Sequence, residues 1–215
     1  MTLYLHIGTE KTGSSYLQSL AAQNREQLRE AGIHFPSAGK RDAQMLRGKI
    51  SAGNAQSLTD AIRSDNWLVV ETLLSQWIKE AQAQHCHSLL LSNELLVLAL
   101  ALPGRLEQLN QRTTSLGIRD TQAILILRDP VEQALSLYKH RAKSGSALPI
   151  EEWPEIHYHY GKGLFDFLQE AESSDLTLKV RKYRKQGLED VFFRQWLGVK
   201  IDMSPVKRVV NPSLS

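Results

Sequence analysis

One segment near the amino terminus, Gly8 to Ser15, has residues whose types and spacing could bind an anion. Gly8 and Gly13 match the glycines of the G-x-x-x-x-G-K-[ST] loop, in which backbone N–H groups surround a phosphate. Ser14 stands where that pattern has lysine, and the lysine of this segment is Lys11. The segment therefore offers N–H groups, hydroxyls and one ammonium to phosphate or sulfate. The alternative is a polar strand-to-helix turn whose glycines serve only the backbone.

A second candidate lies far along the chain, after the apolar run Ala123 to Leu127. Arg128 follows this run directly, and Ser136 lies about two turns into the helix expected next. Arginine suits a phosphate because its planar guanidinium offers paired donors. In the alternative interpretation, Arg128 pairs with Asp129 or with a helix end, and Ser136 is a surface hydroxyl.

Proton transfer requires a general base close to the bound anion. Glu94 is the leading candidate, because it follows the apolar run Ser88 to Leu91 at the expected carboxyl edge of a sheet. Its alternative role is that of a carboxylate favoured by the dipole of a helix that it begins. His6 is the other candidate base, unless it is a structural histidine of its strand.

Two strings of residues resemble the sulfotransferases that use 3′-phosphoadenosine 5′-phosphosulfate (PAPS): HIGTEKTGSSYLQ from 6 to 18 and LRDPVEQALSLY from 127 to 138. The resemblance implies a three-layer, P-loop-like α/β fold with a central parallel sheet flanked by helices. It also implies PAPS as donor co-substrate, with no metal. The donor-binding residues that it implies are Lys11, Thr12, Gly13, Ser14 and Ser15 for the 5′-phosphosulfate, and Arg128 and Ser136 for the 3′-phosphate.

The same resemblance implies that sulfuryl transfer to a hydroxyl or amine uses Lys11 at the leaving phosphate and Glu94 as catalytic acid or base. A carbohydrate is the expected acceptor class. The chain departs from the family where Gln133 replaces a common basic residue. Relatives often continue beyond Ser215, and the segment from Arg208 resembles an incomplete donor-binding segment. We therefore expect one domain, 1–215, possessing most of the family pattern.

The elements that must position these residues alternate between strand and helix. Apolar runs predict strands, and apolar residues at helical spacing predict helices. Asp129 is expected to cap a helix that begins at Pro130, with Glu132 completing a capping box. The predicted strands are Leu3 to Ile7, Ser88 to Leu91, Ala123 to Leu127 and Leu176 to Val180, and the other predicted helices span Leu17 to Ala31, Trp67 to Ala81 and Val191 to Leu197. This order predicts a parallel sheet covered on both faces.

The composition of the 215 residues is that of an ordinary globular protein, with 42% hydrophobic residues and a formal net charge of +3. Cys86 is the only cysteine, so no internal disulfide can form. The amino terminus lacks the pattern of a signal peptide, and the most apolar stretch, Leu95 to Leu102, is too short to span a bilayer. These features favour a cytoplasmic protein without a membrane span and without a nucleic-acid partner.

Three weaker features have competing interpretations. His85, Cys86 and His87, like His157 and His159, lack a partner cluster, so no metal site is expected. The aromatic residues between Ser144 and Gly163 either pack a long loop or broken helix over the site or bind a flat acceptor such as a sugar. A basic run is either a solvated face or attracts an anionic acceptor; it comprises Lys179, Arg181, Lys182, Arg184 and Lys185.

Two other function classes fit the same loop. A nucleotide kinase or NTPase would use a loop of this kind, but Lys11 is displaced from the usual lysine position and no aspartate follows Leu91 to hold a metal. A noncatalytic protein that binds a nucleotide or polyanion would need no further residues. The three function classes differ in whether the chain binds 3′,5′-ADP, whether it binds Mg-ATP, and whether it transfers a group to an acceptor.

Overall fold

The computed structural model describes residues 1–49, 51–143, 145, 148–158 and 160–202. Its centre is a five-stranded sheet in the order β2-β3-β1-β4-β5, and all neighbouring strands are parallel. The strands are β1 (Thr2–Gly8), β2 (Ile33–His34), β3 (Ser88–Ser92), β4 (Asp120–Leu127) and β5 (Thr177–Lys182). The predicted α/β class with a central parallel sheet is confirmed.

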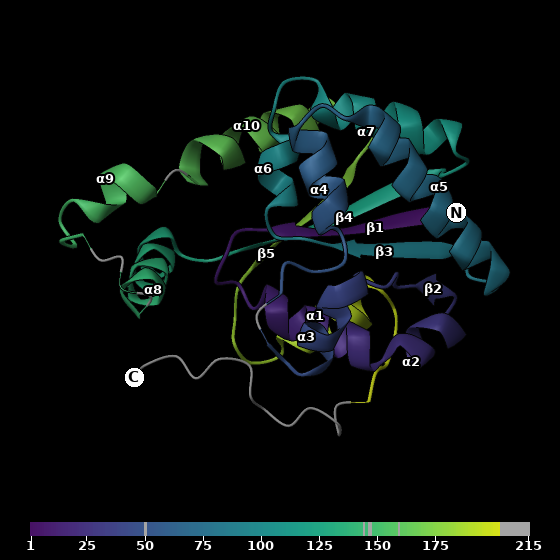
Figure 1. Ribbon diagram of the computed structural model, residues 1–215, viewed down its shortest axis with the longest axis horizontal. Helices are drawn as coiled ribbons and strands as arrows, with labels where there is room; N and C mark the ends of the chain where they lie inside the picture. The colour runs from purple at the N-terminus through teal and green to yellow at the C-terminus, as the bar shows by residue number, and fades with distance from the viewer. Residues whose placement is uncertain (50, 144, 146–147, 159, 203–215) are drawn as a thin grey trace.

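Helices cover both faces of this sheet, as Figure 1 shows. On one face lie α4 (Gln56–Arg63), α5 (Trp67–Ala83), α6 (Leu96–Leu100), α7 (Arg105–Ser115) and α10 (Tyr160–Glu172). On the other lie α1 (Ser14–Gln23), α2 (Arg25–Glu30), the 3₁₀ turn η1 (Gly39–Arg41), α3 (Asp42–Leu46) and the π-helix η2 (Asp190–Trp196). Each layer has its own apolar core.

Alternation along β1 divides its side chains between the two cores. Leu3, Leu5 and Ile7 are fully buried in the core beneath α4 to α7, whereas Tyr4 packs into the opposite core. The strand is buried from Leu5 to Gly8 on both faces, including His6. Since β1 also has a partner strand on each side, the loop that follows it starts from a fixed position.

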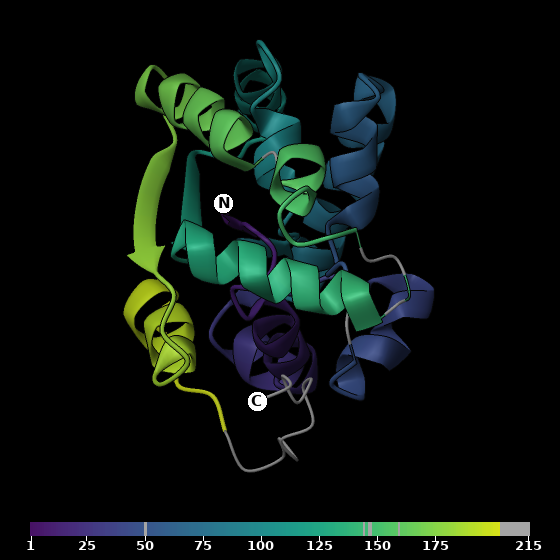
Figure 2. The ribbon, with the colours of Figure 1, turned by 90° about the vertical axis from the view of Figure 1, so that its left-hand side faces the viewer.

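The region from α8 (Pro130–Lys143) to α9 (Trp153–His157) lies beyond the carboxyl ends of the strands (Figure 1). Figure 2, turned so that this edge faces the viewer, shows α8 running across it. Leu137 of α8 and Trp153 of α9 are buried against each other. The α8–α9 region therefore lies beside the end of the sheet where Gly8 to Ser15 is found.

Several predicted boundaries need correction. The helix expected from Leu17 to Ala31 is two helices, α1 and α2, because the chain leaves helical geometry at Asn24. The Asn24 amide donates to the carbonyl of Leu20, which the Asn24 backbone N–H also contacts. Such local side-chain bonding competes with a continuing helix.

At α8 the expected start is confirmed, since Asp129 accepts from the N–H groups of Val131 and Glu132. The Glu132 side chain accepts from Arg128, so its predicted capping-box role is replaced by an ion pair. The last predicted helix, Val191 to Leu197, is the π-helix η2.

Two structural features are absent from the described residues. None of the helices there is long and apolar enough to cross a membrane. Among the same residues, no group of three or more His, Cys, Asp or Glu side chains is placed to hold a metal ion.

Candidate active site

The segment Gly8 to Ser15 forms a tight turn between β1 and α1. Gly13 precedes α1 with φ of 83°, and Lys11 also has a positive φ, 67°. That backbone conformation is costly for a residue with a side chain and is found most often at functional sites. The Thr12 hydroxyl donates to the carbonyl of Thr9 at 2.7 Å and closes the turn from inside. Thr12 is fully buried, so its hydroxyl stabilises the turn from within.

The start of α1 supplies the donors that a phosphate or sulfate requires. The carbonyl of Gly13 accepts from the N–H groups of Tyr16 and Leu17, which begins the helix. The N–H groups of Ser14 and Ser15 belong to the first turn, where a helix provides no internal acceptor. An anion placed there also meets the positive end of the helix dipole. Three of the predicted donor-binding residues, Gly13, Ser14 and Ser15, therefore lie at one helix end.

Arg128 reaches this turn from the end of β4. Its Nη1 donates to the carbonyl of Lys11 at 3.3 Å, and its Nε donates to Glu132 at 3.2 Å. The guanidinium lies over the ring of Tyr183, 5.4 Å from the ring centre. Its side chain is three-quarters buried, with 25% exposed. The two segments that the sequence predicts as halves of one anion site thus meet at Lys11 and Arg128.

Helix α8 makes a second connection to the turn through Gln133. Gln133 is buried, and its amide donates to the carbonyl of Glu10 at 2.9 Å. Ser136 follows Gln133 by three residues, so the two side chains lie on the same face of α8. Ser136 is half-buried on that face. Gln133, which departs from the family pattern, positions the turn by a neutral hydrogen bond.

Glu94 lies in the turn after β3, beside the start of α1. The pKa of its carboxyl is raised to about 7: burial and the charge of Glu10 raise it, whereas a hydrogen bond with Ser14 and the charge of Lys11 lower it. A carboxyl with a pKa near neutrality exists in both protonation states at physiological pH. That property is expected of a general acid or base.

Lys11 is half-buried among charges of both signs. Burial lowers the pKa of its ammonium, the carboxylates of Glu10 and Glu94 raise it, and Lys143 and Arg128 lower it. On α8, the charge of Lys11 is the main cause of a lowered pKa of His140. The Lys11 ammonium therefore interacts electrostatically with both glutamates and with charged residues of α8.

His6, the alternative base, is 1% exposed on β1. Its Nδ1 hydrogen-bonds with the Ser92 hydroxyl at 2.8 Å, and its ring meets the edge of Phe192. Burial lowers the pKa of His6 to about 3, so the imidazole stays neutral. A side chain so enclosed has little access to an acceptor.

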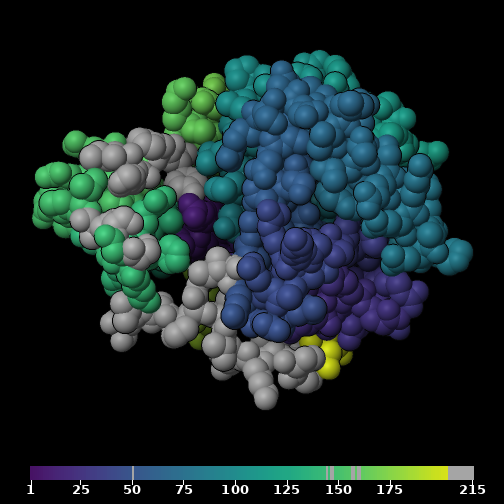
Figure 3. All heavy atoms as spheres, viewed as in Figure 1, coloured from purple at the N-terminus to yellow at the C-terminus, as the bar shows by residue number. Residues whose placement is uncertain are grey.

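An open groove of about 300 Å³ continues from Arg128 along the ends of β4 and β5. Its lining residues are Leu127, Arg128, Asp129, Val180, Arg181 and Lys182. Two members of the basic run, Arg181 and Lys182, thus border the same groove as Arg128. In Figure 3, purple atoms from the amino-terminal part of the chain lie in a recess between the green atoms of the α8–α9 region and the blue body.

The described aromatic side chains of the α8–α9 region contact residues of α8. Trp153 is 1% exposed and contacts Tyr138 edge-on, and the Tyr158 hydroxyl donates to Gln133 at 2.9 Å. Trp153 therefore offers no open face to a sugar ring. The side chains of His157, His159 and Tyr160, and the closing segment Arg208 to Ser215, lie outside the residues whose side chains the structure describes.

Three residues contact or influence the site in ways that the sequence did not predict. Glu10 acts on the pKa values of both Glu94 and Lys11, and Leu188 approaches Gly13 so closely that an added Cβ would lie 2.6 Å from it. Tyr183 belongs to the late segment, 180–197, that resembles the sulfotransferase family, but its position beneath Arg128 was not predicted. Glu10 adjoins Lys11 in sequence, and that proximity was the available signal. The other two come from the segment after β5, whose contact with the turn exists only in the folded chain.

No family model matches the chain, and no curated protein matches it. Among solved structures, it is similar to a sulfotransferase domain from the curacin biosynthetic pathway. The sequence identity is 12%, the TM-score is 0.46, and the similarity covers 93% of this chain and 75% of that chain.

Proposed function

We propose that this chain transfers a sulfuryl group from PAPS to a hydroxyl or amine of an acceptor. The observation that carries the proposal is the meeting of Arg128 with the carbonyl of Lys11, which joins the helix-end anion site to a second cation suited to phosphate. A donor with phosphate groups at both ends of its sugar matches two such subsites. Gly13, Ser14 and Ser15 face the 5′ end in this scheme, and Arg128 and Ser136 face the 3′-phosphate.

Glu94 acts as the base. Its carboxylate takes the proton from the acceptor hydroxyl as the acceptor oxygen attacks sulfur, and the bond between sulfur and the 5′-phosphate oxygen breaks. The products are the sulfated acceptor, protonated Glu94 and 3′,5′-ADP. A pKa of about 7 suits this role, because the base is substantially ionised at neutral pH and still binds the proton well.

Lys11 stabilises the departing phosphate oxygen. Negative charge accumulates there as the bond to sulfur breaks, and an ammonium already positioned beside it lowers the barrier without reorganisation. The positive φ of Lys11 directs its carbonyl to Arg128 and so fixes the residue between the two subsites. Loss of such a charge costs about 100-fold to 1,000-fold in kcat, by analogy with removal of an oxyanion donor.

The carbohydrate acceptor, by contrast, stays a prediction with less support. The aromatic residues between Ser144 and Gly163 were the features that suited a sugar ring, and one of them, Trp153, is buried. The acceptor class is therefore proposed only as a hydroxyl or amine that reaches Glu94. The basic residues Arg181 and Lys182 at the groove leave an anionic acceptor open as a second prediction.

The decisive measurement is calorimetry with 3′,5′-ADP and, separately, ATP with and without Mg²⁺. Tight binding of 3′,5′-ADP that does not depend on Mg²⁺ supports the sulfotransferase. Preferential binding of Mg-ATP contradicts it and favours a kinase or NTPase.

Turnover is tested with ³⁵S-labelled PAPS and a broad library of hydroxyl and amine acceptors. We expect transfer by the native chain and a loss of about 100-fold or more in Lys11→Ala, with Lys139→Ala on the exposed surface of α8 as the matched control. If no acceptor receives label while Lys11→Ala still binds 3′,5′-ADP, a noncatalytic binding role is the better account.

A further inference from the structure

A buried polar network lies directly beneath Glu94, outside the groups that would touch donor or acceptor. Its centre is Ser92, the last residue of β3, which is 1% exposed. The amide of Gln18 on α1 donates to the Ser92 hydroxyl at 3.2 Å. The same hydroxyl hydrogen-bonds with Nδ1 of His6 at 2.8 Å. One hydroxyl thus joins β1, β3 and α1.

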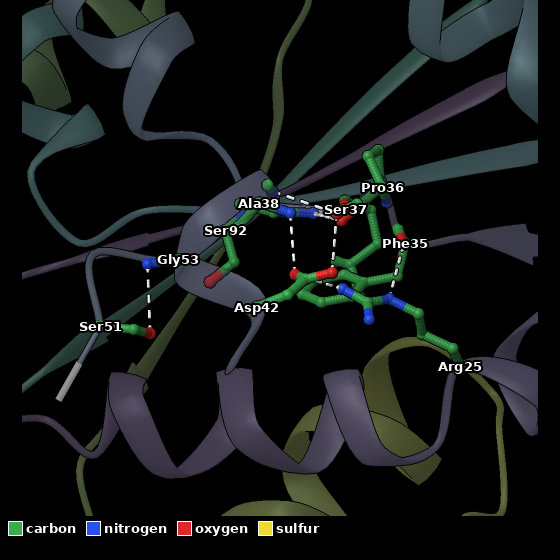
Figure 4. A network of polar contacts seen from close by, with 12 residues as sticks. Arg25, Phe35, Pro36, Ser37, Ala38, Asp42, Ser51, Gly53 and Ser92 are labelled. Atoms are coloured by element: carbon green, nitrogen blue, oxygen red, sulfur yellow. Dashed lines mark hydrogen bonds and ion pairs between the residues drawn. The ribbon is translucent and has the colours of Figure 1, made fainter. Parts of the chain in front are cut away.

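The network continues into the segment 51–56, which precedes and begins α4. The hydroxyl of Ser51 donates to the Gln18 carbonyl oxygen at 2.8 Å. Asn54 accepts from the backbone N–H of Ser92 at 2.7 Å and donates to the carbonyl of Leu90. The segment therefore hydrogen-bonds to the end of β3 as an additional strand would, although it is not part of the sheet. Figure 4 shows Ser51 and Gly53 of this segment beside Ser92.

Gly53 shows how closely the segment packs on β3. A Cβ at this position would lie 2.0 Å from the carbonyl oxygen of Ser92, and Gly53 has φ of 73°. Only glycine permits both the conformation and the approach. The carbonyl of Ser92 also accepts from the N–H of Ala55. Backbone and side-chain contacts thus hold the end of β3 from the same side.

Asn93 completes the network one residue before the base. It is fully buried, and its amide donates to the carbonyl of Ala52 and to the side chain of Gln56, both at 2.9 Å. Its side-chain oxygen accepts from the N–H of Leu95 at 2.7 Å, and its own N–H donates to the carbonyl of His6. Both flanks of Glu94 are therefore fixed by Asn93.

We propose that Gln18, Ser92 and Asn93 are positioning residues that hold Glu94 at a fixed place relative to the first turn of α1. The proposal rests on the proposed function. Gln18 lies one turn after Ser14 on the helix whose start would hold the donor, and Ser92 and Asn93 carry the turn that contains the base. The network thereby fixes the distance between the donor subsite and the base, a distance on which an in-line transfer depends.

The principal test is Ser92→Ala, which leaves Gln18 and His6 without their shared partner. We expect kcat to fall by about 10-fold to 100-fold, while affinity for 3′,5′-ADP stays within about twofold. Ser92→Thr, which keeps the hydroxyl, should restore kcat. The control is Thr113→Val, which removes a buried hydroxyl bonded to Asn110 on α7, away from the network.

A second measurement is independent of turnover. In protein labelled with ¹³C at glutamate carboxyls, NMR titration of Glu94, assigned with Glu94→Gln, should give a pKa near 7 in the native chain. Ser92→Ala should lower it by about one unit, because a displaced carboxyl becomes better hydrated. Thr113→Val should leave it unchanged. If Ser92→Ala does not fold, Ser51→Ala removes the outermost hydrogen bond of the network and is expected to shift the titration in the same direction.

The outcomes separate this proposal from the proposed function. Absence of any sulfuryl transfer by the native chain overturns the function, whereas the titration still decides the position of Glu94. An unchanged Glu94 titration together with a native kcat in Ser92→Ala overturns the positioning role. So does a parallel loss of kcat, 3′,5′-ADP affinity and thermal stability that matches Thr113→Val, since that would be a purely structural effect.

Discussion

The burial of the Glu94 carboxyl lowers the stability of the folded chain at neutral pH. Its carboxyl has a pKa of about 7 in the folded chain against an ordinary value of 4.5. Because the folded state binds this proton more tightly than the unfolded state, the contribution of Glu94 to stability falls as pH rises from about 4.5 through 7. The difference between the two pKa values corresponds to about 3 kcal/mol once both states are ionised.

Glu94→Gln should therefore inactivate the protein and stabilise it. Relative to the native chain, we expect its free energy of unfolding to be similar near pH 4 and higher by up to about 3 kcal/mol at pH 8. Denaturant unfolding of both proteins at several pH values measures this difference. A pH-independent difference would show that the carboxyl is not held in a destabilising environment.

Arg128 is predicted to act through its geometry as well as its charge. Arg128→Lys keeps the charge but loses the planar fork that contacts the Lys11 carbonyl and Glu132 and lies over Tyr183. We expect affinity for 3′,5′-ADP to fall by about tenfold or more, as measured by calorimetry. Arg119→Lys is the control, because Arg119 is exposed before the amino end of the same strand. Equal affinities in both variants would contradict a directed role for Arg128.

For individual residues, the sequence indicated which side chains could bind an anion but not which residues would surround them in the fold. Spacing and chemistry indicated Gly8 to Ser15 and Arg128 as anion ligands, and the fold brings them together. The contact of Gln133 with the Glu10 carbonyl could not be foreseen, because it depends on how α8 crosses the end of the sheet. The burial of Trp153 was left open for the same reason.

Among the elements, the turn before α1 has the strictest requirements. Gly13 combines a positive φ with the close approach of Leu188, whereas Gly117 has a nearly identical φ, 84°, and open space around it. Gly117→Ala should therefore report the conformational cost alone, about 1–2 kcal/mol.

Gly13→Ala should cost more than Gly117→Ala in denaturant unfolding and should also weaken 3′,5′-ADP binding, since the segment after β5 must move away from the turn. Gly117→Ala should bind normally. If the two variants unfold alike and bind alike, the contact between Leu188 and the turn has no role in shaping the site.

Strands were the most predictable elements, because buried strands leave a regular apolar pattern. All four predicted strands are present, with ends shifted by up to three residues. The two-residue β2 and the five-residue α6 were missed because neither is long enough to display a period. The sequence analysis also missed α4, α7 and most of α10, although these helices have 8, 11 and 13 residues. The break at Asn24 is accompanied by a side-chain hydrogen bond that hydrophobic periodicity does not report, and periodicity does not distinguish a π-helix from an α-helix over seven residues.

For the whole molecule, the strand order predicts a gradient of protection. β1 has a hydrogen-bonded neighbour on both sides, whereas β5 borders the sheet and exposes Val180, Arg181 and Lys182. Its charged residues oppose pairing with another chain. In native-state hydrogen exchange, we expect amides of β1 to exchange only through global unfolding and those of β5 through smaller openings. Equal free energies of exchange in the two strands would contradict this.

The central place of β1 also has a consequence for how the protein is made. The partners of this strand are residues 88–92 and 120–127, which are synthesised after it. The position of the turn that begins at Gly8 is not fixed until both partner strands have been synthesised. During translation, then, the nascent chain contains Gly8 to Ser15 well before it contains the strands that hold this turn in place.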